Sequence, residues 1–373
     1  MKRHTPTYFL ALAAIVAAEA PSARASAQEA LPTAILSQAD SARLVGAARS
    51  DQSQFERLRR NNLPEVWGRG SSRCDERIGR FCLTHSRGRD AWVAPPEAEA
   101  VISARLALVD GLGRVAELMP GDGWIAGQRV RYLVEARRFD QALTAARECR
   151  AERSWCSALA GFAFHYAAQP LEADSAFATA LAAMDEEERQ TWLDLTQILD
   201  HRTVRTYRRM DDQAQAAFER RFWHLADPLL TRPGNELLAE HLARHVWDQL
   251  QFRAQSPDGI SWGYDLREIL LRYGWPSGYE RVRDWGTNLA AGPPSLISHY
   301  GGAPQDLLPP RESLLDETGT SGTWDIEDPR SRTGYSLPFA DSVARWFHPL
   351  AHQVAVFRRG GEALVVAGYE LPR

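Results

Sequence analysis

The middle of the chain repeats itself, and this repetition constrains the fold more than any other feature of the sequence. Residues 124–149 have the apolar periodicity of two helices joined by a turn, and residues 155–184 repeat that arrangement. Ala142 of the first copy and Ala173 of the second copy are 31 residues apart. A single helical hairpin cannot bury its apolar face alone, so we expect the repeated hairpins to stack on their neighbours.

The side chains of the second copy indicate a known kind of repeat. Small and aromatic residues have the separations of a tetratricopeptide repeat, which residues 96–205 therefore resemble: Gly161, Phe164, Ala173, Phe177 and Ala180. The period is slightly shorter than the usual ~34 residues, which predicts a tightened turn at Gln169–Pro170. Two copies are fewer than a stable stack usually needs, and a bundle of four unrelated helices is the alternative interpretation.

A longer helix before the repeats is expected to supply part of the missing layer. It begins near Pro96, stops at Pro120–Gly121, and has an apolar stripe with the helical period at Val101, Ala104, Leu108, Leu112, Val115 and Met119. Upstream, residues 28–95 predict two polar helices over 37–62, followed by a short hairpin or irregular segment. The arginine block at 57–60 is typical of a solvated helix face.

The first 27 residues are predicted to be a secretory signal peptide. Lys2, Arg3 and His4 form a basic start, residues 8–18 are apolar, and Ala25-Ser26-Ala27 is a small-residue cleavage site. We therefore expect a bacterial protein exported to the periplasm or beyond. No later stretch approaches the ~20 apolar residues of a membrane helix, so we expect no stable membrane anchor.

The charge of the mature chain argues against a nucleic-acid partner. Removing the signal takes three of the 44 basic residues and one of the 48 acidic residues, which leaves a net charge of −6. A nucleic-acid-binding domain normally carries a basic net charge, and this weakly acidic chain gives no such footprint.

The four cysteines form two local pairs. Cys74 lies eight residues before Cys82, and Cys149 lies seven residues before Cys156. An even, locally paired set in an exported protein predicts two disulfides. A zinc site is the alternative, but neither pair has the two-residue spacing that is typical of two cysteine ligands of one zinc ion. The second bridge would pin the junction between the two repeated hairpins.

The residues after the repeats predict helices and then a short strand. Phe218, Phe222, Trp223 and Leu225 precede Asp227–Pro228, and Asn235–Glu236 opens a further helix. Residues 259–276 predict a turn, a strand around 269–272 and a second turn. Region 213–285 resembles the GWxTD domain of exported bacterial proteins. The resemblance depends on the following residues and on their order along the chain: Arg221-Phe222-Trp223, Asp227-Pro228, Thr231, Asn235-Glu236, Arg244, Trp262, Asp265 and Arg272-Tyr273-Gly274-Pro276.

The resemblance implies export and architecture without implying a reaction. In the name-giving motif Ser261 replaces Gly, Tyr264 replaces Thr, and Leu266-Arg267 stand where the family has Arg-Gly. The candidate binding residues of the motif, within a domain at 206–285, are Trp223, Asp227, Asn235, Glu236, Arg244, Trp262, Asp265, Arg272 and Tyr273.

The same motif residues also suit a purely structural role. Trp223 and Trp262 would fill a small core, while Asp227 and Asn235 would bond backbone amides at turns and helix starts. Asp265 would pair with Arg267 or Arg272.

Two segments complete the chain. Residues 286–340 are a long Pro/Gly-rich connection, and residues 341–373 predict a β-hairpin with its turn at Gly360–Gly361. A lone hairpin is marginal in water, so we expect it to join strands of the motif region or to belong to a larger β-sandwich. The fold class predicted for the whole chain is mainly α with a smaller α+β part.

The sequence predicts no catalytic residues, metal or cofactor. His241 and His245 have the spacing of two zinc ligands on a helix, but residues 242–244 lack the glutamate of the metalloprotease motif, which favours ordinary helix-face histidines. The mature chain has no lysine for a phosphate-binding loop. The acidic run at 185–188 is typical of a solvated helix end.

Two functions fit these observations. The first is an exported, non-enzymatic interaction or scaffold module whose helical repeats present a concave surface to a protein partner. The second is an exported hydrolase with a site between the GWxTD-like region and residues 286–340.

Overall fold

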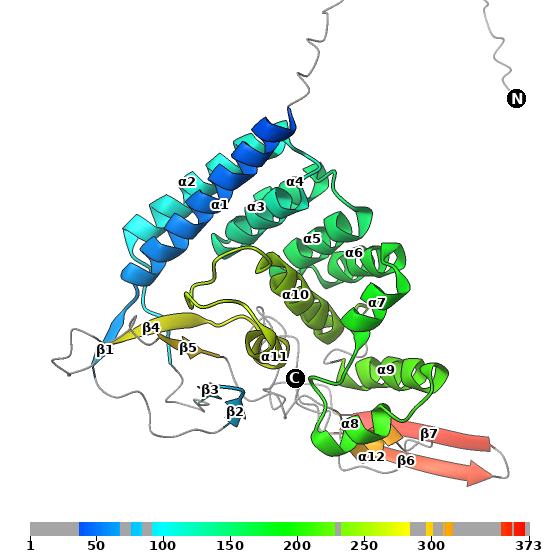
Figure 1. The fold of residues 1–373 in the computed structure, drawn as a ribbon. Helices are drawn as coiled ribbons and strands as arrows, with labels where there is room; N and C mark the ends of the chain where they lie inside the picture. Colours follow the sequence, from blue (N-terminus) through cyan, green and yellow to red (C-terminus); the bar gives the residue numbers. More distant parts are fainter. Residues whose placement is uncertain are drawn as a thin grey trace, which may run out of the picture.

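The computed structural model is mainly helical, as the sequence predicts, with small sheets near its periphery (Figure 1). It describes residues 37–67, 76–83, 92–227, 233–283, 296–300, 309, 311–315, 352–359 and 362–369. The predicted signal peptide, Cys74 and Thr231 lie outside these residues. No helix within the described ranges combines the length and the apolar character that a membrane span needs.

The first layer is an antiparallel pair of long helices, α1 (Gln38–Asn61) and α2 (Glu99–Leu118). The prediction of two helices over 37–62 was wrong, because Ser37 caps one continuous helix of 24 residues. The helix continues through Gly46, which has no neighbour that a Cβ would meet. The second helix follows the predicted apolar stripe, and Val101, Leu108 and Leu112 are buried on it.

The predicted hairpins are present as α3 (Gly123–Glu135) with α4 (Phe139–Glu148), and α5 (Arg153–Tyr166) with α6 (Pro170–Ala183). The backbone repeats with the 31-residue period. Arg137 and Ala168 occupy the same repeat position and both have φ of 57°, the left-handed conformation that ends a helix. The helices touch closely where small residues lie, and a Cβ on Gly161 would come within 2.8 Å of the Phe177 ring.

A nearly buried helix, α10 (Glu236–Leu250), lies on the inner side of the curved row of hairpins (Figure 1). It packs against α3, α5 and α6, and Leu242, Val246 and Trp247 are each at most 2% exposed. The largest core cluster runs from Ala48 of α1 through the hairpins and α10 to Leu270. One core therefore includes residues of three predicted segments.

The predicted strand at 269–272 was wrong, because these residues belong to helix α11 (Tyr264–Tyr273). Leu270 faces the main core, while Ile269 and Tyr273 pack against a small hairpin of β2 (Glu76–Ile78) and β3 (Phe81–Leu83). The apolar residues of α11 are thus buried on two sides of the helix, one against the main core and one against the β2–β3 hairpin.

A second core lies beyond the repeats. It includes residues of α8 (His201–Tyr207), α9 (Asp212–Ala226) and the start of α10, together with Leu314 of α12 (Arg311–Leu315). The short helix α7 (Glu186–Leu193) connects the repeats to this part of the chain. Residues 311–315 were expected to be part of an irregular connection, and their helix is held against α9.

The remaining strands form two small sheets. β4 (Gly278–Arg283) pairs in parallel with β1 (Glu65–Trp67) and antiparallel with β5 (Leu296–His299). Strands β6 (His352–Arg359) and β7 (Glu362–Tyr369) form the predicted C-terminal hairpin. Within the described residues this hairpin is a separate two-stranded sheet.

A buried charge cluster joins α1, α2 and α3. The carboxylate of Glu135 is in ion-pair contact with Arg59, with Arg131 at 3.0 Å and with Arg105 at 3.8 Å. Glu56 lies 2.9 Å from Arg131 and accepts a hydrogen bond from the Tyr132 hydroxyl. The expectation of a fully solvated arginine face at 57–60 was therefore wrong for Arg59, which is 7% exposed.

Candidate functional site

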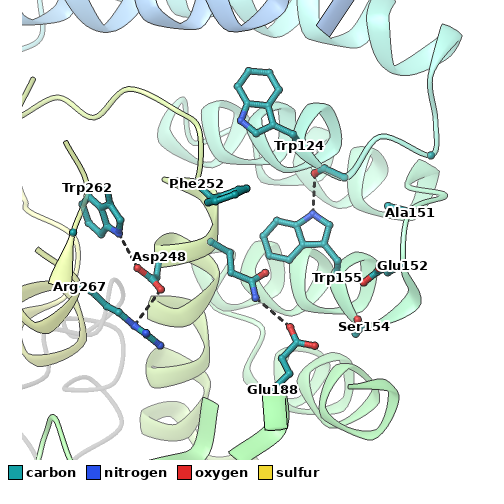
Figure 2. A pocket seen from close by; sticks show the side chains of 14 residues that line it. Trp124, Ala151, Glu152, Ser154, Trp155, Glu188, Asp248, Phe252, Trp262 and Arg267 are labelled. Carbon is teal, nitrogen blue, oxygen red and sulfur yellow. Dashed lines mark hydrogen bonds and ion pairs between the residues drawn. The ribbon is translucent and has the colours of Figure 1, made fainter. Parts of the chain in front are cut away.

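A large cavity lies where the repeats meet α10 and α11, and we refer to it as the tryptophan pocket (Figure 2). Its volume is about 810 Å³, in the range that holds drug-sized ligands. Its lining residues come from the starts of α3, α5 and α7, the end of α10, and the start of α11: Gly121, Gly123, Trp124, Ala151, Glu152, Ser154, Trp155, Glu188, Asp248, Gln249, Phe252, Trp262, Gly263 and Arg267.

The repeat itself supplies two walls of the pocket. Trp124 and Trp155 are separated by the 31-residue period and lie at the starts of α3 and α5. The Trp155 indole donates a hydrogen bond to the carbonyl of Gly123, with Nε1 and O 2.8 Å apart. A Cβ on Gly123 or Gly127 would come within 3.2 and 3.0 Å of the Trp155 ring, so both glycines make room for it.

The opposite wall is built around Asp248 near the end of α10. One carboxylate oxygen accepts a hydrogen bond from Trp262 Nε1 at 2.7 Å, and the other lies 3.2 Å from Arg267 Nε (Figure 2). Burial raises the pKa of Asp248 above its usual value, although Trp262 and Arg267 both oppose the shift. The aspartate thus fixes the position of Trp262 relative to α10 and α11.

Phe252 occupies the space between these walls. It follows α10, and 65% of its surface is exposed (Figure 2). A large aromatic side chain that is both exposed and next to a cavity is available for contact with a ligand.

A second cavity of about 310 Å³ adjoins the tryptophan pocket, and we refer to it as the acidic recess. The two cavities share Glu188, Asp248, Gln249 and Arg267. The remaining lining residues of the recess are Asp185, Glu187, Thr191, Trp192 and His245. Glu188 is held in place by Gln249, which donates a hydrogen bond over 3.2 Å.

The disulfide of the repeat region borders the pocket. Cys149 and Cys156 are bridged as the sequence predicts, and their bridge closes the loop that carries Ala151, Glu152 and Trp155. The predicted Cys74–Cys82 bridge lies outside the described residues. The observed disulfide therefore restrains one wall of the pocket.

The structure separates the predicted motif residues into two groups. Trp262 lines the tryptophan pocket, whereas Trp223 is buried under α10, as expected for a core residue. Asn235 caps α10 by accepting a hydrogen bond from the Leu238 amide, as predicted, and it also donates to the carbonyl of Trp223.

Arg244 connects α10 to the end of α11. Its Nε donates to Glu240 at 2.7 Å, and its Nη1 donates to the carbonyl of Leu271 at 2.9 Å. Gly274 follows with φ of 79°, and a Cβ there would lie 3.0 Å from the guanidinium. Burial alone would raise the pKa of Glu240, but Arg244 and His165 outweigh it and hold the pKa below its usual value.

The other motif residues lie away from the tryptophan pocket. Asp265, which we expected to pair with Arg267 or Arg272, accepts a hydrogen bond from the Arg80 amide over 3.4 Å. Arg272 lies 2.9 Å from Glu268. Tyr273 and Glu236 are each 2% exposed, and Asp227 ends α9.

The two candidate zinc ligands are core residues rather than members of an exposed helix face. His241 is fully buried, His245 is 3% exposed, and their rings contact each other at 4.8 Å between centroids. Burial lowers the pKa of His241 to about 3 and that of His245 well below its usual value. Across the described residues there is no cluster of three or more metal-ligating side chains.

Among the pocket residues, Trp124, Trp155, Asp248 and Phe252 were not named from the sequence. Glu188 was expected only in a solvated helix end and Arg267 only as a partner of Asp265, and both line the two cavities. The separation of the two tryptophans by one repeat period was a usable signal. Nothing local connects them to Asp248 or Arg267, which follow them by more than 90 residues.

Comparisons with protein-family models, curated proteins and solved structures found no match. The resemblances to tetratricopeptide repeats and to the GWxTD domain therefore stay predictions. The geometry of the pocket is the basis for the function argued below.

Proposed function

We propose that this protein is an exported, non-catalytic binding module that holds a segment of a partner protein in the tryptophan pocket. The predicted signal peptide supports export, and the Cys149–Cys156 bridge supports an oxidising compartment. The proposal depends on one observation, the convergence of Trp124, Trp155 and Trp262 on an open cavity of about 810 Å³. Aromatic side chains in desolvated pockets carry much of the energy of protein–protein contacts.

The pocket is a better candidate for the partner site than the inner side of the repeats. α10 covers that inner side, and twelve of its fifteen residues are buried. The tryptophan pocket, in contrast, opens at the helix starts and exposes Phe252. We therefore assign the partner to the pocket.

Two carboxylates shared by the pocket and the recess, Asp248 and Glu188, are engaged by neighbouring side chains. A general acid or nucleophile needs an oxygen directed at the substrate. Both oxygens of Asp248 are engaged, by Trp262 and Arg267, and Glu188 accepts a hydrogen bond from Gln249. These contacts suit fixed walls, so we assign Asp248 and Glu188 a binding role and prefer a binding pocket to an exported hydrolase.

Site-specific photocrosslinking in the native host tests the proposal. A photoreactive phenylalanine analogue at Phe252 is expected to form an adduct with a defined segment of one exported protein. The same analogue at Leu171, which is 51% exposed on α6, is the matched control and is expected to give no such adduct. Equal labelling from both positions, or no adduct from Phe252, would contradict the proposal.

A further inference from the structure

The charge around the two connected cavities is strongly unbalanced. Their lining residues include one guanidinium, Arg267, and five carboxylates: Glu152, Asp185, Glu187, Glu188 and Asp248. Arg267 already forms an ion pair with Asp248 at 3.2 Å. The other four carboxylates therefore face the cavities without a cation among the lining residues.

Helix capping explains only part of this acidity. Asp185 caps α7, and Glu187 and Glu188 lie in its first turn, where the helix dipole favours anions. Each helix start supplies only about half a positive charge. The starts of α5 and α7 thus offset about one of the four carboxylates, and a negative potential remains at the cavities.

The aromatic walls can also attract a cation. A guanidinium or ammonium group over a tryptophan face is favoured by the ring quadrupole. The chain already makes this contact at the edge of the pocket, where Arg49 lies 5.3 Å from the centroid of the Trp124 ring. Trp155 and Trp262 line the same cavity beside the carboxylates.

A buried polar atom in the acidic recess is a further, independent observation. His245 lines the recess and is 3% exposed, and its Nε2 has no hydrogen-bond partner among the described residues. Burial, together with His241 and Arg267, keeps this imidazole neutral by lowering its pKa. A neutral ring nitrogen without a partner can exchange a hydrogen bond with a polar ligand atom.

We propose that the tryptophan pocket and the acidic recess together bind an arginine or lysine side chain carried by an extended segment of the partner. The inference rests on the proposed function and specifies its ligand chemistry. The charged group lies between a tryptophan face and the carboxylates of α7, while Trp124 and Phe252 contact the flanking residues. Charge complementarity thus selects a basic segment over a neutral or acidic one.

Short peptides with one variable residue test this inference on the full mature chain. The probes are the acetylated, amidated peptide Gly-Ser-Arg-Ser-Gly and its lysine and citrulline versions. Citrulline keeps the shape of arginine but lacks its charge. The readout is the set of tryptophan indole N–H signals in a ¹⁵N-labelled sample, with the Trp155 and Trp262 signals assigned through phenylalanine variants.

The arginine and lysine peptides are expected to shift the pocket indole signals and to bind about tenfold more tightly than the citrulline peptide. Their affinity is expected to fall when the ionic strength rises from about 0.05 to 0.5 M. The double variant Glu187→Gln with Glu188→Gln is expected to weaken arginine binding toward the citrulline level. Asp110→Asn, which neutralises an exposed carboxylate on α2 outside both cavities, is the matched control and is expected to change nothing.

The outcomes separate this inference from the proposed function. Equal binding of the arginine and citrulline peptides, or no binding of any peptide at millimolar concentration, overturns the cation inference. A specific adduct at Phe252 would then still support a protein-binding pocket. If chitotetraose shifts the indole signals and the peptides do not, both the cation inference and the protein-partner function fail, because the pocket then binds carbohydrate.

Discussion

The substitution Glu135→Gln tests whether the buried charge cluster holds the first layer of helices to the repeats. Glu135 lies at the end of α3 and faces Arg59 of α1, Arg105 of α2 and Arg131 of its own helix. Its side chain is 11% exposed. Burial alone would raise the pKa of Glu135, but the three guanidinium groups outweigh it and lower the pKa to about 2.

Two arguments give the magnitude of the effect. A pKa of about 2 in place of the usual 4.5 corresponds to about 3 kcal/mol of stabilisation at neutral pH. Removing one partner from a buried ion pair typically costs about 3 to 5 kcal/mol, because the remaining charge stays buried. We expect Glu135→Gln to lower the free energy of unfolding by about 3 kcal/mol at pH 7.

The same pKa sets the direction of the pH dependence. A carboxylate whose pKa is lowered by folding stabilises the protein fully above its unfolded-state pKa, near 4.5. That stabilisation is lost as the pH falls towards the folded-state pKa of about 2, where Glu135 is protonated. The difference between the wild type and Glu135→Gln should thus be constant from pH 7 to about 5.5 and should narrow below it.

Urea unfolding followed by far-UV circular dichroism at several pH values measures this difference. Glu148→Gln is the control, because Glu148 is 56% exposed and pairs with Arg129 at 2.7 Å on the surface of the hairpin. Surface pairs contribute about 0 to 1 kcal/mol, so the control should differ little from the wild type. A loss below 1 kcal/mol for Glu135→Gln, or a loss that persists unchanged at pH 3, would refute the reasoning.

Three further substitutions test the packing of the repeats and of α10. Gly161→Ala should lower the urea midpoint and cost about 1 kcal/mol or more, because the added Cβ would meet the Phe177 ring. This loss should exceed the gain from the better helix propensity of alanine. The control Gly46→Ala, at an open helix position, should leave the midpoint equal or higher. Changing both cysteines of the α4–α5 disulfide to serine should cost about 2 kcal/mol, since the closed loop is short, and an unchanged midpoint under oxidising conditions would contradict this. Asn235→Ala removes the cap of α10 and should cost about 1 to 2 kcal/mol in the same assay, whereas a loss below 0.5 kcal/mol would show that water replaces the cap.

The sequence predicted the repeats because their signals are local. Small residues at Gly161 and Ala173 recur with the helical period, and Pro170 marks a helix start. Two polar helices were predicted over 37–62, but α1 is one continuous helix whose polar residues Gln52 and Glu56 bond to α3 in the core. A buried polar partner from another helix leaves no local trace.

The strand predicted at 269–272 failed for a related reason. A short apolar run followed by a glycine fits a buried strand and a buried helix equally well. The environment decides between them, since Ile269 and Leu270 face two different packing surfaces around α11. The histidines of α10 were likewise expected on a helix face. They are buried because Trp192 of α7 stacks on His245 and Trp223 of α9 contacts His241.

The walls of the tryptophan pocket are fixed both by contacts within the repeats and by contacts between distant segments of the chain, and this rigidity affects ligand binding. Each wall is fixed before any ligand arrives: Trp155 by two glycines and the Gly123 carbonyl, Trp262 by Asp248, and the loop between the hairpins by a disulfide. A preorganised site loses little conformational entropy on binding, so its affinity reflects the chemistry of its walls. Removing a contact that fixes a wall and removing a carboxylate should therefore affect ligand affinity differently. The first weakens binding of every ligand, and the second weakens only the binding of cations.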